Sequence, residues 1–105
     1  MINLYLDDIR WAVEDYPYKE SKDTLWLTVR DIETCQHWLT IKKVNNISLD
    51  GDMGQDSTGK DIPGGVELLE WMMVNNIWPE GFIFIHSRNP IKKEVMRSII
   101  QARKK

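Results

Sequence analysis

Short apolar segments alternate along this chain with longer stretches in which apolar residues recur every three or four positions. We expect four strands, because four segments are apolar or alternating and too short for helices: residues 2–6, 24–29, 46–49 and 82–85. Helical spacing predicts three helices, over residues 32–41, from Val66 to near Asn75, and from Pro90 onward. The order of strands and helices indicates an α/β fold with a mostly parallel, four-stranded sheet flanked by helices.

Capping residues and core-facing positions support the three helices. Asp31 is a good N-cap for the first, and Asn89 followed by Pro90 is a strong start for the last. The expected inward positions are Ile32, Cys35, Trp38 and Leu39, then Val66, Leu69, Met72 and Met73, and finally Val95, Met96, Ile99 and Ile100. Residues 11–23 show no clean period and predict an irregular connection. Residues 50–65 hold five of the six glycines and predict a loop.

The length of 105 residues predicts a single domain over residues 1–105, with one hydrophobic core. One cysteine excludes an internal disulfide, and no run approaches the ~18 apolar residues of a membrane span. Cys35 and His37 lack metal-ligand spacing, so we interpret them as a buried thiol and a surface imidazole. The N-terminus shows no secretory pattern, and we expect a reducing, cytoplasmic setting and no membrane.

Charge is unevenly distributed along the chain. The formal net charge is -2, but from Arg88 to Lys105 seven basic residues face one acidic residue. Such a segment predicts contact with an anion such as RNA. The alternative is a solvated helix end whose cations complement the helix dipole, and this alternative is the commoner case.

Three of the predicted strands end in polar clusters. Asp7 and Asp8 follow the first strand, Asp50 and Asp52 follow the third, and His86 leads the cluster after the fourth. Because parallel strands of an open sheet end at one edge, where ligands bind, we expect the clusters to form one site. Each Asp could instead begin a loop by capping a turn.

Gathered carboxylates repel one another unless a cation or protons neutralise them. Mg²⁺ or Mn²⁺ held by Asp7, Asp8 and Asp50 resolves this conflict, because such ions accept carboxylates and share their shell with a phosphate. Asp52 would orient a water, and His86 is the side chain best suited to move protons near neutral pH.

Further residues around these clusters could bind phosphate. Arg10 and Arg88 offer forked donors, or they only neutralise neighbouring Asp residues. Ser87, with Asn89 and the first amides of the last helix, could hold a phosphate oxygen or simply cap that helix. Thr58 and Lys60 lie in the glycine-rich loop and could close over a ligand, although the spacing does not match a Walker-type phosphate loop.

Together these motifs carry a resemblance to a known family. The segments LYLDDIR (4–10), SLDGDMG (48–54), TGKD (58–61), Trp78-Pro79 and HSRNP (86–90) resemble the cyclic-phosphate processing receiver-like domain family over nearly the whole chain. The resemblance implies a small receiver-like three-layer sandwich that lacks the last strand-helix unit of a full receiver. It also implies a role in handling cyclic phosphates. Family members usually have His where this chain has Gly51, and Lys60 stands where an aromatic residue is common.

The resulting hypothesis is a metal-dependent phosphodiesterase that opens a cyclic phosphate on a nucleotide or a 2′,3′-cyclic RNA end. His86 would protonate the departing ribose oxygen, with Asp50 and Asp52 as its catalytic partners. The first alternative is a binding module that captures the same ligand without cleaving it, which Gly51 favours. The second is a phospho-acceptor receiver with Asp50 as acceptor, although that activity normally needs a further strand ending in Lys.

Overall fold

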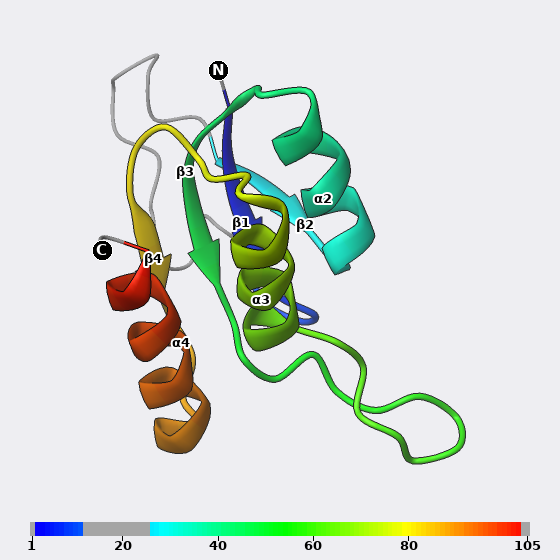
Figure 1. Cartoon of the computed structure of the whole chain (residues 1–105). Coiled ribbons are helices and arrows are strands. Elements are labelled where there is room, and N and C mark those ends of the chain that lie inside the picture. Colours follow the sequence, from blue (N-terminus) through cyan, green and yellow to red (C-terminus); the bar gives the residue numbers. More distant parts are fainter. Residues whose placement is uncertain (1, 12–25, 104–105) are drawn as a thin grey trace.

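Four parallel strands form the sheet of this chain in a computed structural model that describes residues 2–11 and 26–103. They are β1 (Ile2–Leu6), β2 (Trp26–Val29), β3 (Val44–Leu49) and β4 (Ile83–Ile85), and their order across the sheet is β2-β1-β3-β4. Each neighbouring pair is parallel. The carboxyl ends of all four strands therefore point toward one edge of the sheet, as Figure 1 shows.

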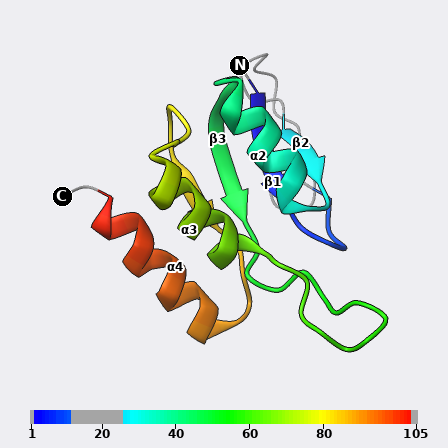
Figure 2. The ribbon, with the colours of Figure 1, turned by 45° about the vertical axis from the view of Figure 1, so that its right-hand side comes forward.

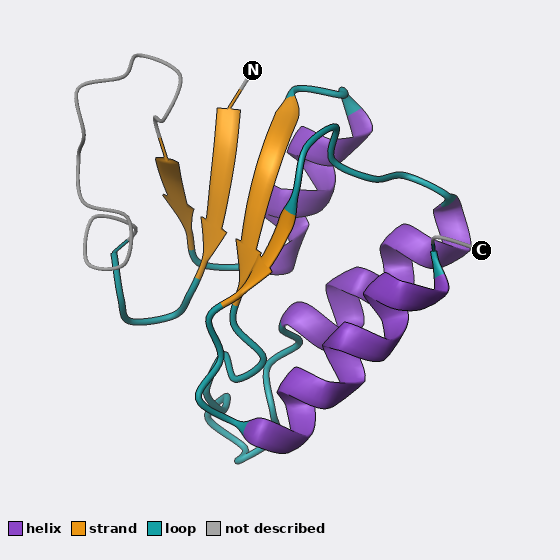
Figure 3. Cartoon of the chain, turned by 90° about the vertical axis from the view of Figure 1, so that its left-hand side faces the viewer, coloured by secondary structure: helices purple, strands orange, loops and turns teal. Residues whose placement is uncertain are grey.

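Three helices lie on one face of this sheet (Figure 3): α2 (Ile32–Thr40), α3 (Gly65–Asn75) and α4 (Pro90–Ala102). The two predicted N-caps are confirmed. The Asp31 carboxylate accepts a hydrogen bond from the Thr34 amide at 2.8 Å, and the Asn89 side chain accepts from the Ile91 and Lys92 amides at 3.0 and 3.1 Å. None of the described helices has the length and apolar character that a membrane span requires.

The hydrophobic core lies between the sheet and these helices. Cys35 is fully buried in it, whereas His37 is exposed, as expected from the sequence. Because side chains alternate along a strand, Tyr5, Ser48 and Phe84 lie on the opposite face from the core. The buried core consists of Leu4, Leu6, Val29, Cys35, Leu39, Val44, Ile47, Leu49, Met53, Leu68, Leu69, Met72 and Met96.

Two predicted core positions are wrong. Met73 is 40% exposed and Val95 is 42% exposed, because α3 and α4 bury narrower faces than their apolar patterns suggest. Leu68 is fully buried instead of Met73, and α4 packs through Met96. β3 begins at Val44, two residues earlier than predicted. The predicted connection over residues 11–23, apart from Trp11, lies outside the described residues, as do residues 24 and 25 of the second predicted strand.

The loop between β3 and α3 contains a small hairpin that projects away from the rest of the molecule (Figure 2). An antiparallel bridge joins Gln55 to Asp61, and the Asp56 carboxylate accepts hydrogen bonds from the Thr58 and Lys60 amides and from the Thr58 hydroxyl. Every residue from 54 to 63 is exposed. The hairpin (residues 54–62) is thus stabilised by its own hydrogen bonds rather than by packing.

Candidate functional site

The carboxyl ends of β1, β3 and β4 bring together Asp7, Asp50 and His86. β3 is the neighbour of both other strands, and each of the three residues directly follows its strand. One carboxylate oxygen from each Asp and one ring nitrogen of His86 all lie within 4.8 Å of one another. The polar clusters separated in sequence therefore meet in space, as the parallel sheet predicted.

His86 is held on three sides. Its Nε2 atom lies 3.1 Å from Asp7 Oδ2, and its Nδ1 atom lies 2.7 Å from the Ser48 hydroxyl. The imidazole stacks on the Tyr5 ring, with centroids 4.2 Å apart and planes 6° from parallel. The His86 side chain is only 7% exposed. These contacts fix both the position and the plane of the ring.

Asp7 is a fully compensated carboxylate, although only 1% of the residue is exposed. Its Oδ1 atom accepts hydrogen bonds from the Ile9 and Arg10 amides, both at 2.9 Å, and the Arg10 guanidinium lies 3.4 Å from Oδ2. Burial pushes the pKa of Asp7 upward, but these two amides, together with His86 and Arg10, outweigh burial and lower the pKa below its usual range.

Asp50 is less well compensated, although the Asp52 amide and the charge of Arg10 both act to lower its pKa. It is 8% exposed, and its carboxylate accepts one hydrogen bond, from the Asp52 amide at 3.1 Å. Burial raises the pKa of Asp50 to about 6, and the nearby charges of Asp7 and Asp8 add to the rise. Among the described residues no ion pair reaches this carboxylate. It is therefore the group at this edge that a bound cation would stabilise most.

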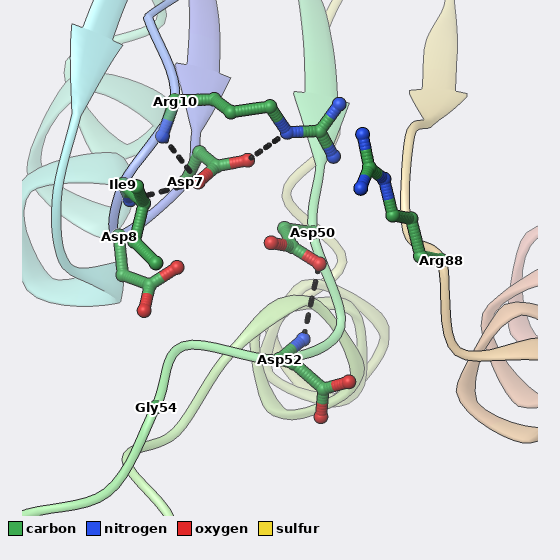
Figure 4. Close-up of a pocket in the computed structure, with 8 residues that line it drawn as sticks. All are labelled: Asp7, Asp8, Ile9, Arg10, Asp50, Asp52, Gly54 and Arg88. Carbon is green, nitrogen blue, oxygen red and sulfur yellow. Dashed lines mark hydrogen bonds and ion pairs between the residues drawn. The ribbon is translucent and has the colours of Figure 1, made fainter.

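A pocket of about 540 Å³ opens above these carboxylates. Figure 4 shows Arg10 and Arg88 extending toward one another over Asp50, each from a different segment, while the Asp8 carboxylate lies below Asp7 in this view. No ion pair in the described part of the chain involves Arg88. His86 does not line the pocket; the lining residues are Asp7, Asp8, Ile9, Arg10, Asp50, Asp52, Gly54 and Arg88.

The predicted metal set of Asp7, Asp8 and Asp50 differs from the set that the structure brings together. His86 joins Asp7 and Asp50, whereas Asp8 contributes to no such group among the described residues. β1 ends at Leu6, so Asp7 and Asp8 follow the strand, and both line the pocket even though Asp8 is not part of the close group. Two carboxylates and one imidazole suit a divalent ion, since ligands about 2.1 Å from a shared ion lie about 3 Å apart.

Asp52 is held by a residue that the sequence did not single out. The Lys92 ammonium group lies 2.7 Å from an Asp52 carboxylate oxygen and donates a hydrogen bond to the Gly51 carbonyl at 3.2 Å. The hydrogen bond from Lys92 lowers the pKa of Asp52, and the same contact raises the pKa of Lys92. A Cβ atom at Gly51 would lie 2.9 Å from Lys92 Cβ, so Lys92 closes the space over Gly51.

The other predicted ligand-binding residues are divided between the pocket and helix capping. Arg10 and Arg88 line the pocket. Ser87 is buried, and its hydroxyl accepts from the Asn89 amide at 3.2 Å, while Asn89 caps α4. Thr58 and Lys60 lie in the hairpin and do not line the pocket. The binding roles of these six residues remain predictions.

Ser48, Tyr5 and Lys92 are the site residues that the sequence reasoning missed. Strand periodicity could have found two of them, because Tyr5 and Ser48 lie two residues before Asp7 and Asp50 and therefore share their face of the sheet. Lys92 gave no comparable signal, since its position depends on how α4 packs.

Comparison with known proteins identifies the family of this fold. A model of the cyclic-phosphate processing receiver domain matches residues 2–102. No curated protein and no solved structure matches the chain. The match covers both strand-end aspartates and His86, and the parallel four-stranded sheet with its helices is the small receiver-like α/β fold that the sequence predicted. The chain belongs to the cyclic-phosphate processing receiver domain family.

Proposed function

We propose that this receiver-like domain is a metal-dependent phosphodiesterase that opens a cyclic phosphate on a nucleotide or RNA end. The observation that carries the proposal is the pocket in which Asp7 and Asp50 lie beneath two guanidinium groups (Figure 4). Carboxylates on one side suit a cation, and guanidinium groups on the other suit phosphate oxygens. A cyclic phosphate with a divalent ion combines both requirements.

Asp7 and Asp50 would hold the ion, and Asp50 has the greater need for it because its buried carboxylate has fewer partners than that of Asp7. When bound, such an ion would draw charge from a phosphoryl oxygen and acidify an attacking water. Arg88 would bind the phosphate, since its guanidinium extends over the pocket. Arg10 already contacts Asp7 and the His86 carbonyl, so it would orient Asp7 as well as the phosphate.

Asp52 and His86 take different positions relative to a substrate in this pocket. The Asp52 carboxylate lines the pocket and is fixed by Lys92, so it can orient a water. His86 would protonate a departing ribose oxygen only if its ring swung away from Asp7 and Ser48. Because the ring is buried, we assign His86 a supporting role within the ion site.

The test is incubation with a 2′,3′-cyclic nucleotide and either Mg²⁺ or Mn²⁺, with products separated by anion exchange and identified by phosphorus NMR. We expect a ring-opened monophosphate, and we expect Asp50→Asn to reduce turnover at least about a hundredfold, since it removes an ion ligand. Glu80→Gln, which changes an exposed carboxylate in the turn before β4, is the matched control and should retain activity. Absence of turnover with every divalent ion and cyclic substrate tested would refute the proposal.

A binding module for the same ligands is the second candidate, and the lack of a side chain at Gly51 favours it. Where the family usually carries His, this chain has Gly51 covered by Lys92, so one imidazole is missing from the pocket. Such a domain would hold a cyclic nucleotide between Arg88 and the carboxylate-bound ion without opening it. Calorimetry followed by recovery of unchanged ligand would select this candidate over the phosphodiesterase.

A further inference from the structure

We propose that His86 completes the ion site through Nε2, that Ser48 fixes the ring for this role, and that the site therefore prefers Mn²⁺ over Mg²⁺. This inference rests on the proposed ion site and names the class of ion that it takes. It also changes the expected role of His86 from proton donor to ligand. Three observations support it.

The first is the spacing of the donor atoms. His86 Nε2 lies 3.1 Å from Asp7 Oδ2, close to the separation of about 3 Å that neighbouring ligands have around one ion. Asp50 supplies a third donor atom within 4.8 Å of both. The three residues come from the ends of three adjacent strands, so the sheet itself sets their separation.

The second is the way Ser48 and Tyr5 hold the ring. Ser48 is fully buried, and its hydroxyl lies 2.7 Å from His86 Nδ1. If Nδ1 carries the proton and donates a hydrogen bond to this hydroxyl, Nε2 has no proton and its lone pair faces the two carboxylates. Histidine ligands of metals are commonly oriented by such a bond from the second nitrogen. The parallel Tyr5 ring restricts rotation out of this plane.

The third is the unbalanced charge of Asp50. A simple hydrogen bond from His86 to Asp7 would satisfy Asp7, which already has two amides and Arg10. It would leave the Asp50 carboxylate, 8% exposed, without an ion pair in the described part of the chain. An ion shared by all three side chains compensates both carboxylates at once.

The ligand chemistry then determines the preference among ions. Mg²⁺ binds oxygen ligands almost exclusively and keeps most of its waters, whereas Mn²⁺ and later transition metals also accept imidazole nitrogen. A site with one imidazole and two carboxylates should therefore bind Mn²⁺ at least about tenfold more tightly than Mg²⁺. Removal of the imidazole should abolish most of this difference.

The experiment measures binding of the metal alone, without any cyclic phosphate. Mn²⁺ is titrated into the full chain while the paramagnetic resonance signal of free Mn²⁺ is followed, and Mg²⁺ is then added as competitor. Spin-echo modulation from a directly bound ¹⁴N nucleus provides a second readout. We expect ¹⁴N modulation in the wild-type protein, its loss in His86→Asn, and a weakening of Mn²⁺ binding of about tenfold in Ser48→Ala.

His37→Asn is the matched control, because His37 is exposed on α2 and should leave both readouts unchanged. His86→Asn should still bind Mg²⁺ within about twofold of the wild-type affinity, which would also show that the site is folded. Equal affinities for the two ions, absence of ¹⁴N modulation in the wild-type protein, or a preference that survives His86→Asn would overturn the inference. Nitrogen-coordinated Mn²⁺ without turnover would refute only the phosphodiesterase.

Discussion

At the scale of single residues, the two buried carboxylates of the site differ in how well their charges are compensated. Asp7 has two backbone amides and Arg10 as partners, and its pKa is lowered in spite of burial. Asp50 has one amide, and burial raises its pKa to about 6. The fold therefore stabilises a negative charge at Asp7 and disfavours one at Asp50 unless something binds there.

This difference predicts that Asp50→Asn stabilises the ion-free protein at neutral pH. The folded chain holds the Asp50 proton up to about pH 6, whereas the unfolded chain releases it near pH 4, so wild-type stability falls as the pH rises between these values. At pH 7 the substitution should raise the free energy of unfolding by about 1 to 3 kcal/mol, and below about pH 4 the difference should vanish. Urea denaturation with a chelator present, from pH 3 to 8, measures both effects.

The control for this prediction is Glu80→Gln, which removes an exposed carboxylate from the turn before β4 and should change stability little. Addition of Mn²⁺ should reverse the order, because only the wild-type protein keeps both carboxylates for the ion. A lower stability of Asp50→Asn than of wild type at pH 7 without metal would show that the Asp50 charge is compensated after all.

At the scale of elements, the contact between α4 and the end of β3 makes Gly51 hard to replace. A Cβ atom there would lie 2.9 Å from Lys92 Cβ and 3.2 Å from both Lys92 Cδ and the Ser87 hydroxyl oxygen. We expect Gly51→Ala to lower the free energy of unfolding by about 1 to 3 kcal/mol, because α4 must move outward. Thermal denaturation followed by circular dichroism measures the loss, with Ser57→Ala in the exposed hairpin as control.

The same contact predicts the effect of Gly51→His, which introduces the residue that the family resemblance implies at this position. Gly51→His places a larger side chain into the space that Lys92 fills, so the single variant should be less stable than Gly51→Ala. Adding Lys92→Ala to Gly51→His removes the contact with Lys92 Cδ but leaves the contact with Lys92 Cβ. The double variant should therefore recover part of the stability that Gly51→His loses. If Gly51→Ala is as stable as wild type, α4 yields more easily than this packing implies.

The elements also show which parts of the site the sequence could predict. Strand ends and helix caps depend on local residue types, so the order of the elements, the Asp31 and Asn89 caps, and the meeting of the Asp50 and His86 clusters could all be inferred. The role of Lys92 could not, because the distance from one helix to the end of a strand depends on packing across the core. For the same reason Val95 was placed in the core, although α4 turns it toward solvent.

At the scale of the whole molecule, three of the seven cations in the basic C-terminal segment have partners within the described part of the chain. Lys92 pairs with Asp52, Arg97 pairs with Glu94 at 2.8 Å, and the Arg103 guanidinium lies over the Trp78 ring at 5.2 Å. RNA contact through α4 therefore stays a prediction. Among the described residues α4 is the last element, and no strand follows β4 before it.

The projecting hairpin allows a last prediction, about which ligands reach beyond the pocket. Its residues are exposed and bond to one another, so replacing residues 55–61 by two glycines should leave the melting temperature nearly unchanged. Because Thr58 and Lys60 do not line the pocket, affinity for a cyclic mononucleotide should change less than about twofold, whereas affinity for a longer RNA with a cyclic end should fall. Calorimetry with both ligands separates these outcomes, and Glu80→Gln again serves as control. A large loss of mononucleotide binding would show that the hairpin closes over the pocket when the ligand is bound.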